Sequence, residues 1–143
     1  MSLSRVFDIA GSAMSVQTVR LNTTASNIAN AEAVSSSTGE TYRARQPIFR
    51  AQYTNALGDG TGVGGPQVVG VEVAGVVESQ APLQKRYEPE HPYADKDGFV
   101  AYPNVNIVEE MANMISASRS FQTGADVTST VKQMFSQVLA LGQ

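Results

Sequence analysis

The stretch LSRVFDIAGSAMSVQTVRLNTTASNIANA, residues 3–31, decides how the rest of the chain is interpreted. Its apolar or small residues recur at spacings that alternate between four and three, at Leu3, Phe7, Ala10, Met14, Leu21 and Ile28. Gln17 and Thr24 fill the remaining two positions of the series. This spacing is the heptad pattern of a coiled coil, and proline does not interrupt it. The stretch therefore predicts one long helix that packs along a seam.

A second long helix is predicted from Ile107 to Gly142. Asn106 precedes it and Glu109 follows three residues later, which is an asparagine form of the capping box. At a rise of about 1.5 Å per residue, the two helices would span roughly 40 and 50 Å, which is too long for this chain to bury alone. The apolar stripe of the second helix runs through Ile107, Met111, Met114, Ser118, Phe121, Ala125, Thr128, Val131, Phe135 and Val138. We expect the two helices to pair as a coiled-coil-like hairpin.

Both predicted helices also carry apolar residues away from these seams. In the first helix they are Val6, Ile9, Ala13 and Val16, and in the second they are Val108, Ile115, Val127, Met134 and Leu139. A helix that is apolar on several sides needs several partners, and an interface that repeats without closing builds a filament. The pattern therefore predicts a structural subunit that assembles with other chains.

The middle of the chain, residues 32–103, contains all six prolines and most of the glycines. Tyr42–Tyr53 and the valine-rich Val68–Glu78 are predicted to be strands, separated by a Gly-rich loop at residues 58–66. Residues 82–103 are expected to be extended without regular structure. The predicted fold class is α+β, with a terminal helical assembly domain (residues 1–31 and 104–143) and a β-rich, extended insert (residues 32–103).

Composition excludes several classes of function. Charged residues make up only 16% of the 143-residue chain, against roughly 25% in typical globular proteins. A net charge of −3 argues against nucleic acid binding, and no apolar run approaches the roughly 20 residues that span a bilayer. The N-terminus lacks the uninterrupted apolar core of a cleaved signal peptide, so any export is expected to use another route. There is no cysteine, which excludes disulfides and Cys-ligated metals.

Four short motifs do not indicate a catalytic, metal-binding, phosphate-binding or glycosylation site. Gly60–Gly65 fits the letters GxGxxG, but Pro66 and a strand follow it where a phosphate site needs a helix. Asp95–Gly98 lacks the flanking ligands of a calcium loop, so a tight turn is predicted. His91 is the only histidine and has no convergent partners, and the sequon at Asn22 falls inside a helix. The sequence therefore predicts no enzyme, metal or cofactor.

Three segments resemble one family. LNTTASNIANA at residues 21–31 resembles the SN(I/L)AN(A) motif near the N-terminus of flagellar rod and hook proteins. DGFVAYPNVN at residues 97–106 with Glu109-Glu110-Met111, and SASRSFQ at residues 116–122, are similar to the signature of the proximal-rod branch of that family. The family pattern usually continues with Ala-Asn, whereas this chain has Thr123-Gly124-Ala125-Asp126, where a glycine would soften the helix.

The resemblance implies a subunit of the bacterial flagellar basal-body rod, which transmits torque from motor to hook. Such a subunit would be exported by the flagellar type III apparatus and assembled across the periplasm with copies of itself, other rod proteins and a FliE-type adaptor. Together with the heptad seams of the two predicted helices, the resemblance predicts a subunit interface. This interface includes Leu3, Phe7, Met14, Leu21, Asn27, Ile28, Asn30, Ile107, Met111, Met114, Phe121 and Phe135.

Two alternatives are left open. One is another flagellar axial protein, of the distal rod or hook-like type, although hook-type proteins carry much larger middle segments. The other is a soluble small-molecule binder built around the Gly-rich loop, which a shift in melting temperature with nucleotides would reveal.

Overall fold

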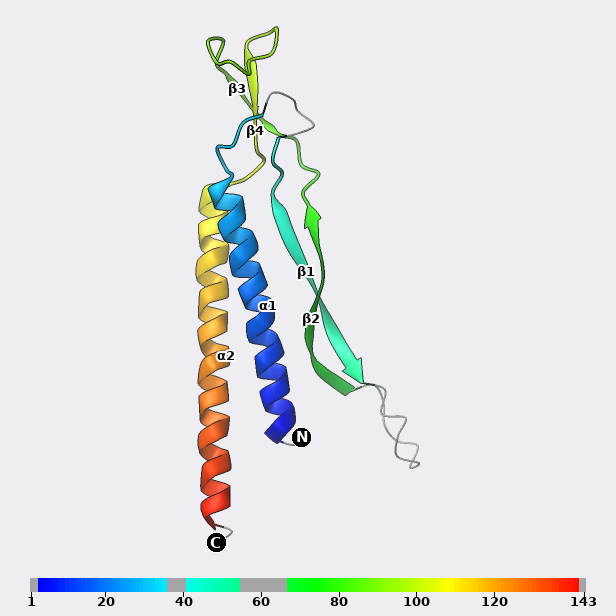
Figure 1. Ribbon diagram of the computed structural model, residues 1–143, viewed down its shortest axis with the longest axis vertical. Helices are drawn as coiled ribbons and strands as arrows, with labels where there is room; N and C mark the ends of the chain where they lie inside the picture. Colours follow the sequence, from blue (N-terminus) through cyan, green and yellow to red (C-terminus); the bar gives the residue numbers. More distant parts are fainter. Residues whose placement is uncertain (1–2, 36–40, 55–66, 142–143) are drawn as a thin grey trace. The chain divides into compact units, whose positions relative to one another are not determined.

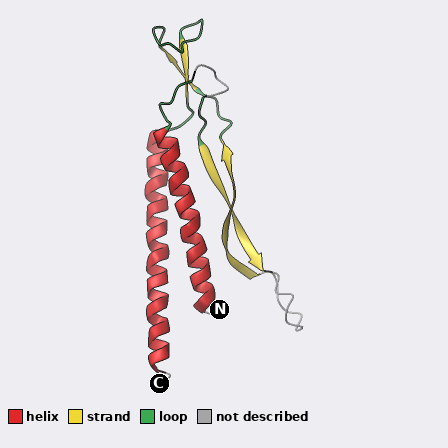
Figure 2. Ribbon diagram, in the orientation of Figure 1, coloured by secondary structure: helices red, strands yellow, loops and turns green. Residues whose placement is uncertain are grey.

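The computed structural model describes residues 3–35, 41–54 and 67–141, and it contains two long helices and four strands (Figure 1). β1 pairs with β2 in one two-stranded sheet, and β3 pairs with β4 in another (Figure 2). The α+β fold with terminal helices is thus confirmed, and both predicted strands are found within a few residues of their expected bounds. The elements are α1 (Leu3–Ala29), β1 (Arg45–Thr54), β2 (Gln67–Glu78), β3 (Gln84–Tyr87), β4 (Phe99–Tyr102) and α2 (Ile107–Leu141).

The chain forms two compact units, and both combine helix segments with segments from the middle of the sequence. One unit, here called the terminal unit, comprises residues 1–19, 48–75 and 117–143. The other, the signature unit, comprises residues 20–47 and 76–116 and holds most of the motifs that resemble the rod family. In each unit a segment of α1 lies beside a segment of α2 with the opposite chain direction (Figure 1).

Within the terminal unit, α1 packs against both α2 and the β1–β2 sheet. Ala10 and Val16 are buried, and a Cβ added at Gly124 of α2 would lie 2.8 Å from Cγ of Met14. On the sheet side, the Val71 amide donates to Oγ of Ser12 over 3.1 Å. Gly124 therefore permits close helix packing, and α2 continues through it without a break.

Within the signature unit, a small core is built where the helix ends meet the middle segments. Ala31, Ala44 and Val105 form a buried cluster with Tyr42 packed against it. Val100 of β4 is also fully buried. β3 and β4 pair antiparallel in a register that places Tyr87 opposite Phe99. Residues 82–103 were expected to lack regular structure, and this expectation is wrong. The alternation in FVAY is short, and the surrounding prolines obscured it.

The turn at Asp95–Gly98 closes the β3–β4 hairpin. Gly98 donates its amide to the Asp95 carbonyl over 2.8 Å and adopts a φ of 78°, a left-handed conformation that favours glycine. The prediction of a tight turn at these residues is confirmed. His91 accepts a hydrogen bond at Nδ1 from the Tyr93 amide, within the same loop. Among the described residues, no cluster of acidic, histidine or cysteine side chains could hold a metal ion.

Replacing Gly98 with alanine is expected to destabilise this hairpin. The left-handed backbone costs a non-glycine residue roughly 1–2 kcal/mol, and a Cβ at this position would lie 2.9 Å from the Tyr87 ring. Amide hydrogen exchange in β3 and β4 should accelerate by about tenfold or more, while exchange in α1 changes little. Gly75→Ala is the matched control, because a Cβ there would meet open space. Unchanged exchange in Gly98→Ala would contradict the assignment of this turn.

The start of α2 agrees with the signal expected from the sequence. Oδ1 of Asn106 accepts hydrogen bonds from the amides of Val108 and Glu109, at 3.1 and 3.4 Å, so the predicted N-cap of α2 is confirmed. At the other end of α1, Asn30 donates to the Ser26 carbonyl over 2.8 Å. The Gly-rich loop at residues 58–66 and the expected stop at Gly142 lie outside the described residues. No helix in the described ranges is both long and apolar enough to cross a membrane.

Candidate assembly surface

The face of α2 that packs on α1 is lined by small and polar residues as well as apolar ones. Besides Asn113 and Ser118, its buried or half-buried positions are Glu110, Met114, Ala117, Gly124, Thr128 and Val131. They are spaced as a heptad series in which Phe121 occupies the remaining position, with 37% of its surface exposed. In the signature unit, Arg20 adds a hydrogen bond to Oδ1 of Asn113 over 3.2 Å. The seam therefore lies within the chain.

This seam differs in phase from the predicted stripe of α2, although the two share Met114, Phe121, Thr128 and Val131. The remaining large members of the predicted stripe are exposed: Ile107, Met111, Phe135 and Val138. The physical reason is close packing, because Ala117 and Gly124 let α1 approach α2 and so displace the larger side chains from the contact.

The residues predicted to contact neighbouring subunits, apart from Leu3, fall into three groups by their exposure. Asn27 is fully buried, and the side chain of Leu3 lies outside the described residues. Half-buried residues are Phe7, Met14, Leu21, Ile28, Asn30 and Met114. Exposed residues, which a neighbour can reach, are Ile107, Met111, Phe121 and Phe135.

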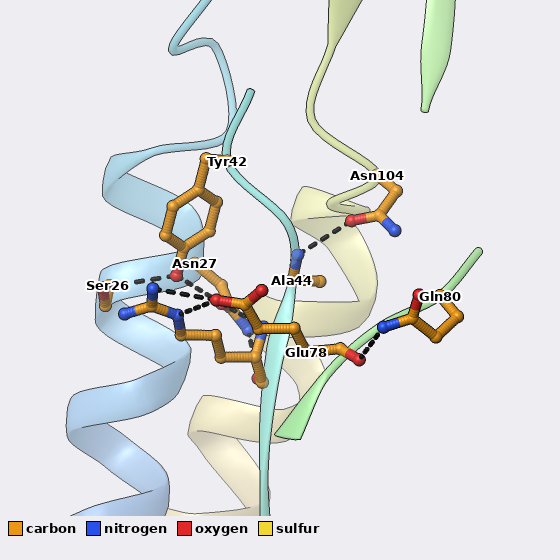
Figure 3. Close-up of polar contacts among 8 residues, drawn as sticks. Ser26, Asn27, Tyr42, Ala44, Glu78, Gln80 and Asn104 are labelled. Carbon is orange, nitrogen blue, oxygen red and sulfur yellow. Dashed lines mark hydrogen bonds and ion pairs between the residues drawn. The ribbon is translucent and has the colours of Figure 1, made fainter. Parts of the chain in front are cut away.

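Asn27 joins α1 to the start of β1 (Figure 3). Its Oδ1 accepts hydrogen bonds from the Arg45 amide at 2.9 Å and from the Tyr42 hydroxyl at 2.8 Å. Its Nδ2 donates to the Arg45 carbonyl at 2.8 Å. The side-chain amide thus pairs with a peptide group as a neighbouring strand would, and it does so at 0% exposure.

Asn104 forms a second clamp on the same segment (Figure 3). Its Oδ1 accepts the Ala44 amide at 2.8 Å, and its Nδ2 donates to the carbonyls of Ser79 and Ala81. Ala44, just before β1, and Arg45, the first residue of β1, are therefore both held by asparagines from the segments that resemble the family. Sequence reasoning missed this internal role. For Asn27, the available signal was an asparagine within an apolar helical pattern.

A polar cluster fastens the β3–β4 hairpin to the end of α1. Arg86 forms a bidentate ion pair with Glu32 and lies 4.2 Å above the ring centroid of Tyr102. The Tyr102 hydroxyl donates to the Glu88 carboxylate. Burial raises the pKa of Tyr102, and the hydrogen bond to Glu88 raises it further, because both favour the protonated phenol.

Two groups of large apolar side chains on α2 stay exposed. We call Ile107, Val108, Met111 and Ile115 the first-turn patch, in which Val108 is 76% exposed. We call Met134, Phe135, Val138 and Leu139 the last-turn patch, in which Val138 is 61% exposed. Contiguous exposed apolar groups of this size mark sites of protein–protein contact. By contrast, the exposed side of α1 carries small or polar residues: Asp8, Gly11, Ser15, Thr18, Asn22, Ala25 and Ala29.

Comparison with known proteins connects this geometry to a family. Residues 7–34 match the family described as "Flagella basal body rod protein", and residues 96–141 match "Flagellar basal body rod FlgEFG protein C-terminal". The flagellar basal-body rod protein FlgC of Salmonella typhimurium is 50% identical over 143 residues, covering 100% of both chains. The chain belongs to the FlgC family. The FlgC protein of Escherichia coli O157:H7 gives the same values, and that of Borreliella burgdorferi is 34% identical, covering 100% of this chain and 99% of the relative.

Membership of this family confirms the predicted function as a structural subunit of the flagellar basal-body rod. Nothing in the comparisons favours the alternative of a distal-rod or hook-like protein. The two family matches lie on segments that contain most of α1 and all of α2, the elements that form the seam. α2 also carries the apolar patches.

Proposed function

We propose that this rod subunit is a non-enzymatic component of the proximal rod, which crosses the periplasm and transmits torque from the motor to the hook. It would be exported by the flagellar type III apparatus. Its partners would be copies of itself, other rod proteins and a FliE-type adaptor. Ile107, Met111, Phe121 and Phe135 are the residues of the predicted interface that we propose contact these partners.

The single observation that carries this proposal is the pair of apolar patches on α2. The seam with α1 is already formed inside the chain, so the exposed first-turn and last-turn patches need a partner from outside it. The two relatives that are 50% identical to this chain are named as basal-body rod proteins, which supports a rod assembly as the partner that would cover these patches.

The geometry also suits a part that carries torque. Every backbone turn of α1 and α2 is hydrogen-bonded within the helix, and close helix contacts such as Met14 against Gly124 leave little room for sliding. Lateral contacts with several neighbours would add many small dispersion terms, which together resist twisting.

The test is to supply the chain in a strain that lacks its own copy of this rod subunit and to isolate basal bodies. We expect swimming to be restored and the chain to co-purify with the rod after removal of the outer rings. The negative control is the same strain with an empty vector, which should yield basal bodies without a complete rod. Complete rods that form without the chain, while the chain stays in the soluble fraction, would exclude a structural role in the rod.

A further inference from the structure

The methionines of the described ranges divide into two in the seam and two outside it. Met14 and Met114 are half-buried where α1 and α2 pack together. Met111 is 54% exposed in the first-turn patch, and Met134 is 49% exposed in the last-turn patch. The side chain of Met1, the fifth methionine of the chain, lies outside the described residues. Each patch therefore presents one thioether to solvent in the free chain.

The packing of Met14 shows why the seam methionines differ from those of the patches. A Cβ added at Gly124 would lie 2.8 Å from Cγ of Met14 and 3.7 Å from its sulfur, so the thioether lies against α2. The oxidation of a methionine follows its exposure, because the oxidant arrives with the solvent. The chain has no cysteine, so no thiol competes with the methionines for an oxidant.

We propose that Met111 and Met134 are oxidation sites of the free subunit, and that their sulfoxides block its entry into the rod. The oxidant is a peroxide, which transfers one oxygen atom to the thioether sulfur. The S–O bond forms as the O–O bond breaks, the sulfur loses two electrons, and hydrogen peroxide is reduced to water. The block to assembly rests on the function proposed above, whereas the oxidation of the free chain does not.

A sulfoxide changes the property on which each patch depends. Methionine is flexible and apolar and adapts to a partner, whereas its sulfoxide is polar. Met111 lies four residues from both Ile107 and Ile115, so a sulfoxide oxygen there would stand within the first-turn patch. The other members of both patches are isoleucine, valine, phenylalanine and leucine, whose side chains have no hydrogen-bond donor. Burying an oxygen without a donor should weaken each contact by on the order of tenfold.

Peroxide treatment of the purified, folded chain tests the two sites. After timed exposure to hydrogen peroxide, proteolysis and mass spectrometry give the extent of oxidation at each methionine. We expect Met111 and Met134 to be oxidised on the order of tenfold faster than Met14 and Met114. The same treatment in concentrated urea is the control, and it should give similar rates at all four residues. Equal rates in the folded chain would overturn the assignment of the sites.

Substitutions test the block to assembly. Glutamine approximates the polarity of a methionine sulfoxide, whereas leucine keeps the apolar character and volume of methionine. Both residues suit a helix, and both positions are exposed, so the folds of the two variants should be equally stable. Thermal unfolding of the purified proteins checks this.

The double variant Met111→Gln, Met134→Gln is compared with Met111→Leu, Met134→Leu in the strain that lacks its own rod subunit. We expect isolated basal bodies to contain on the order of tenfold less rod with the glutamine variant than with the leucine variant. Swimming in soft agar should be weaker with the glutamine variant. Equal amounts of rod with the two variants would overturn the block.

Failure of this inference can be distinguished from failure of the proposed function. If the unaltered chain co-purifies with the rod while the two double variants assemble equally, the proposed function stands and the block does not. An unaltered chain that never enters the rod would remove the proposed function and, with it, the block. The order of oxidation rates in the free chain would be unaffected by that result.

Discussion

Replacing Asn27 with alanine is expected to lower the free energy of unfolding by roughly 2–4 kcal/mol, because three hydrogen bonds are lost together. The change removes both bonds to the Arg45 peptide group and the bond to the Tyr42 hydroxyl. It also leaves a cavity at a position with 0% exposure. Urea unfolding of the purified chain, followed by circular dichroism, measures the effect.

Two companion variants separate the clamp from general effects of substitution. Asn22→Ala changes an exposed asparagine of the same helix, and its effect should stay within about 0.5 kcal/mol. Asn27→Asp keeps an acceptor for the Arg45 amide but turns an oxygen toward the Arg45 carbonyl, so it should destabilise the chain at neutral pH. That loss should diminish as the pH falls and the buried carboxyl gains a proton. Equal stability of Asn27→Ala and Asn22→Ala would refute the clamp.

Charging the last-turn patch is expected to abolish swimming while leaving the fold intact. Phe135→Asp with Val138→Asp places two charges where the rod would bury two large apolar side chains. Each buried, unpaired charge costs several kcal/mol, which exceeds what one weak contact supplies. The measurement is swimming in soft agar, together with the amount of rod in isolated basal bodies.

Gln137→Asp is the matched control, since it adds one charge to an exposed position on the same turns of α2. Because Gln137 lies on the side away from the last-turn patch, swimming should persist with this change. Thermal unfolding of the purified variants should be similar, because all three side chains are exposed. Normal swimming by the double variant would mean that the last-turn patch faces solvent in the rod.

The features of the fold that follow from local pattern could be predicted. The spacing of Phe7, Ala10 and Met14 gave the first helix, and Asn106 gave the start of the second. Valine-rich alternation gave β2. β3 and β4 were missed because two four-residue strands among prolines carry too few residues for a period to show.

The phase of the seam could not be predicted, because two overlapping stripes on α2 consist of residues three or four positions apart. The choice between them depends on how closely the helices approach, and Gly124 against Met14 allows an approach that favours the stripe with smaller residues. A glycine in a helix interior indicates flexibility when the helix is considered alone. The packed pair of helices shows that Gly124 allows Met14 of α1 to lie close against α2.

The residues that resemble the rod family turn out to stabilise the chain itself. Asn27, Gly98 and Asn104 all lie in the signature unit, where each fixes a backbone segment of the same chain. The apolar patches extend beyond these motifs and carry no unusual residue type. A motif search therefore finds the fold of this subunit more readily than its contacts with neighbours.

A cryo-EM map of basal bodies from the complemented strain would show directly whether the apolar patches of α2 are covered in the rod. We expect Val108 and Val138 to be covered by other chains, while Asn27 keeps its bonds to Arg45 within the subunit. The same map would show which chain covers each patch. A map in which both valines face solvent, with the rod held together by other surfaces, would show that the patches of α2 are not assembly contacts.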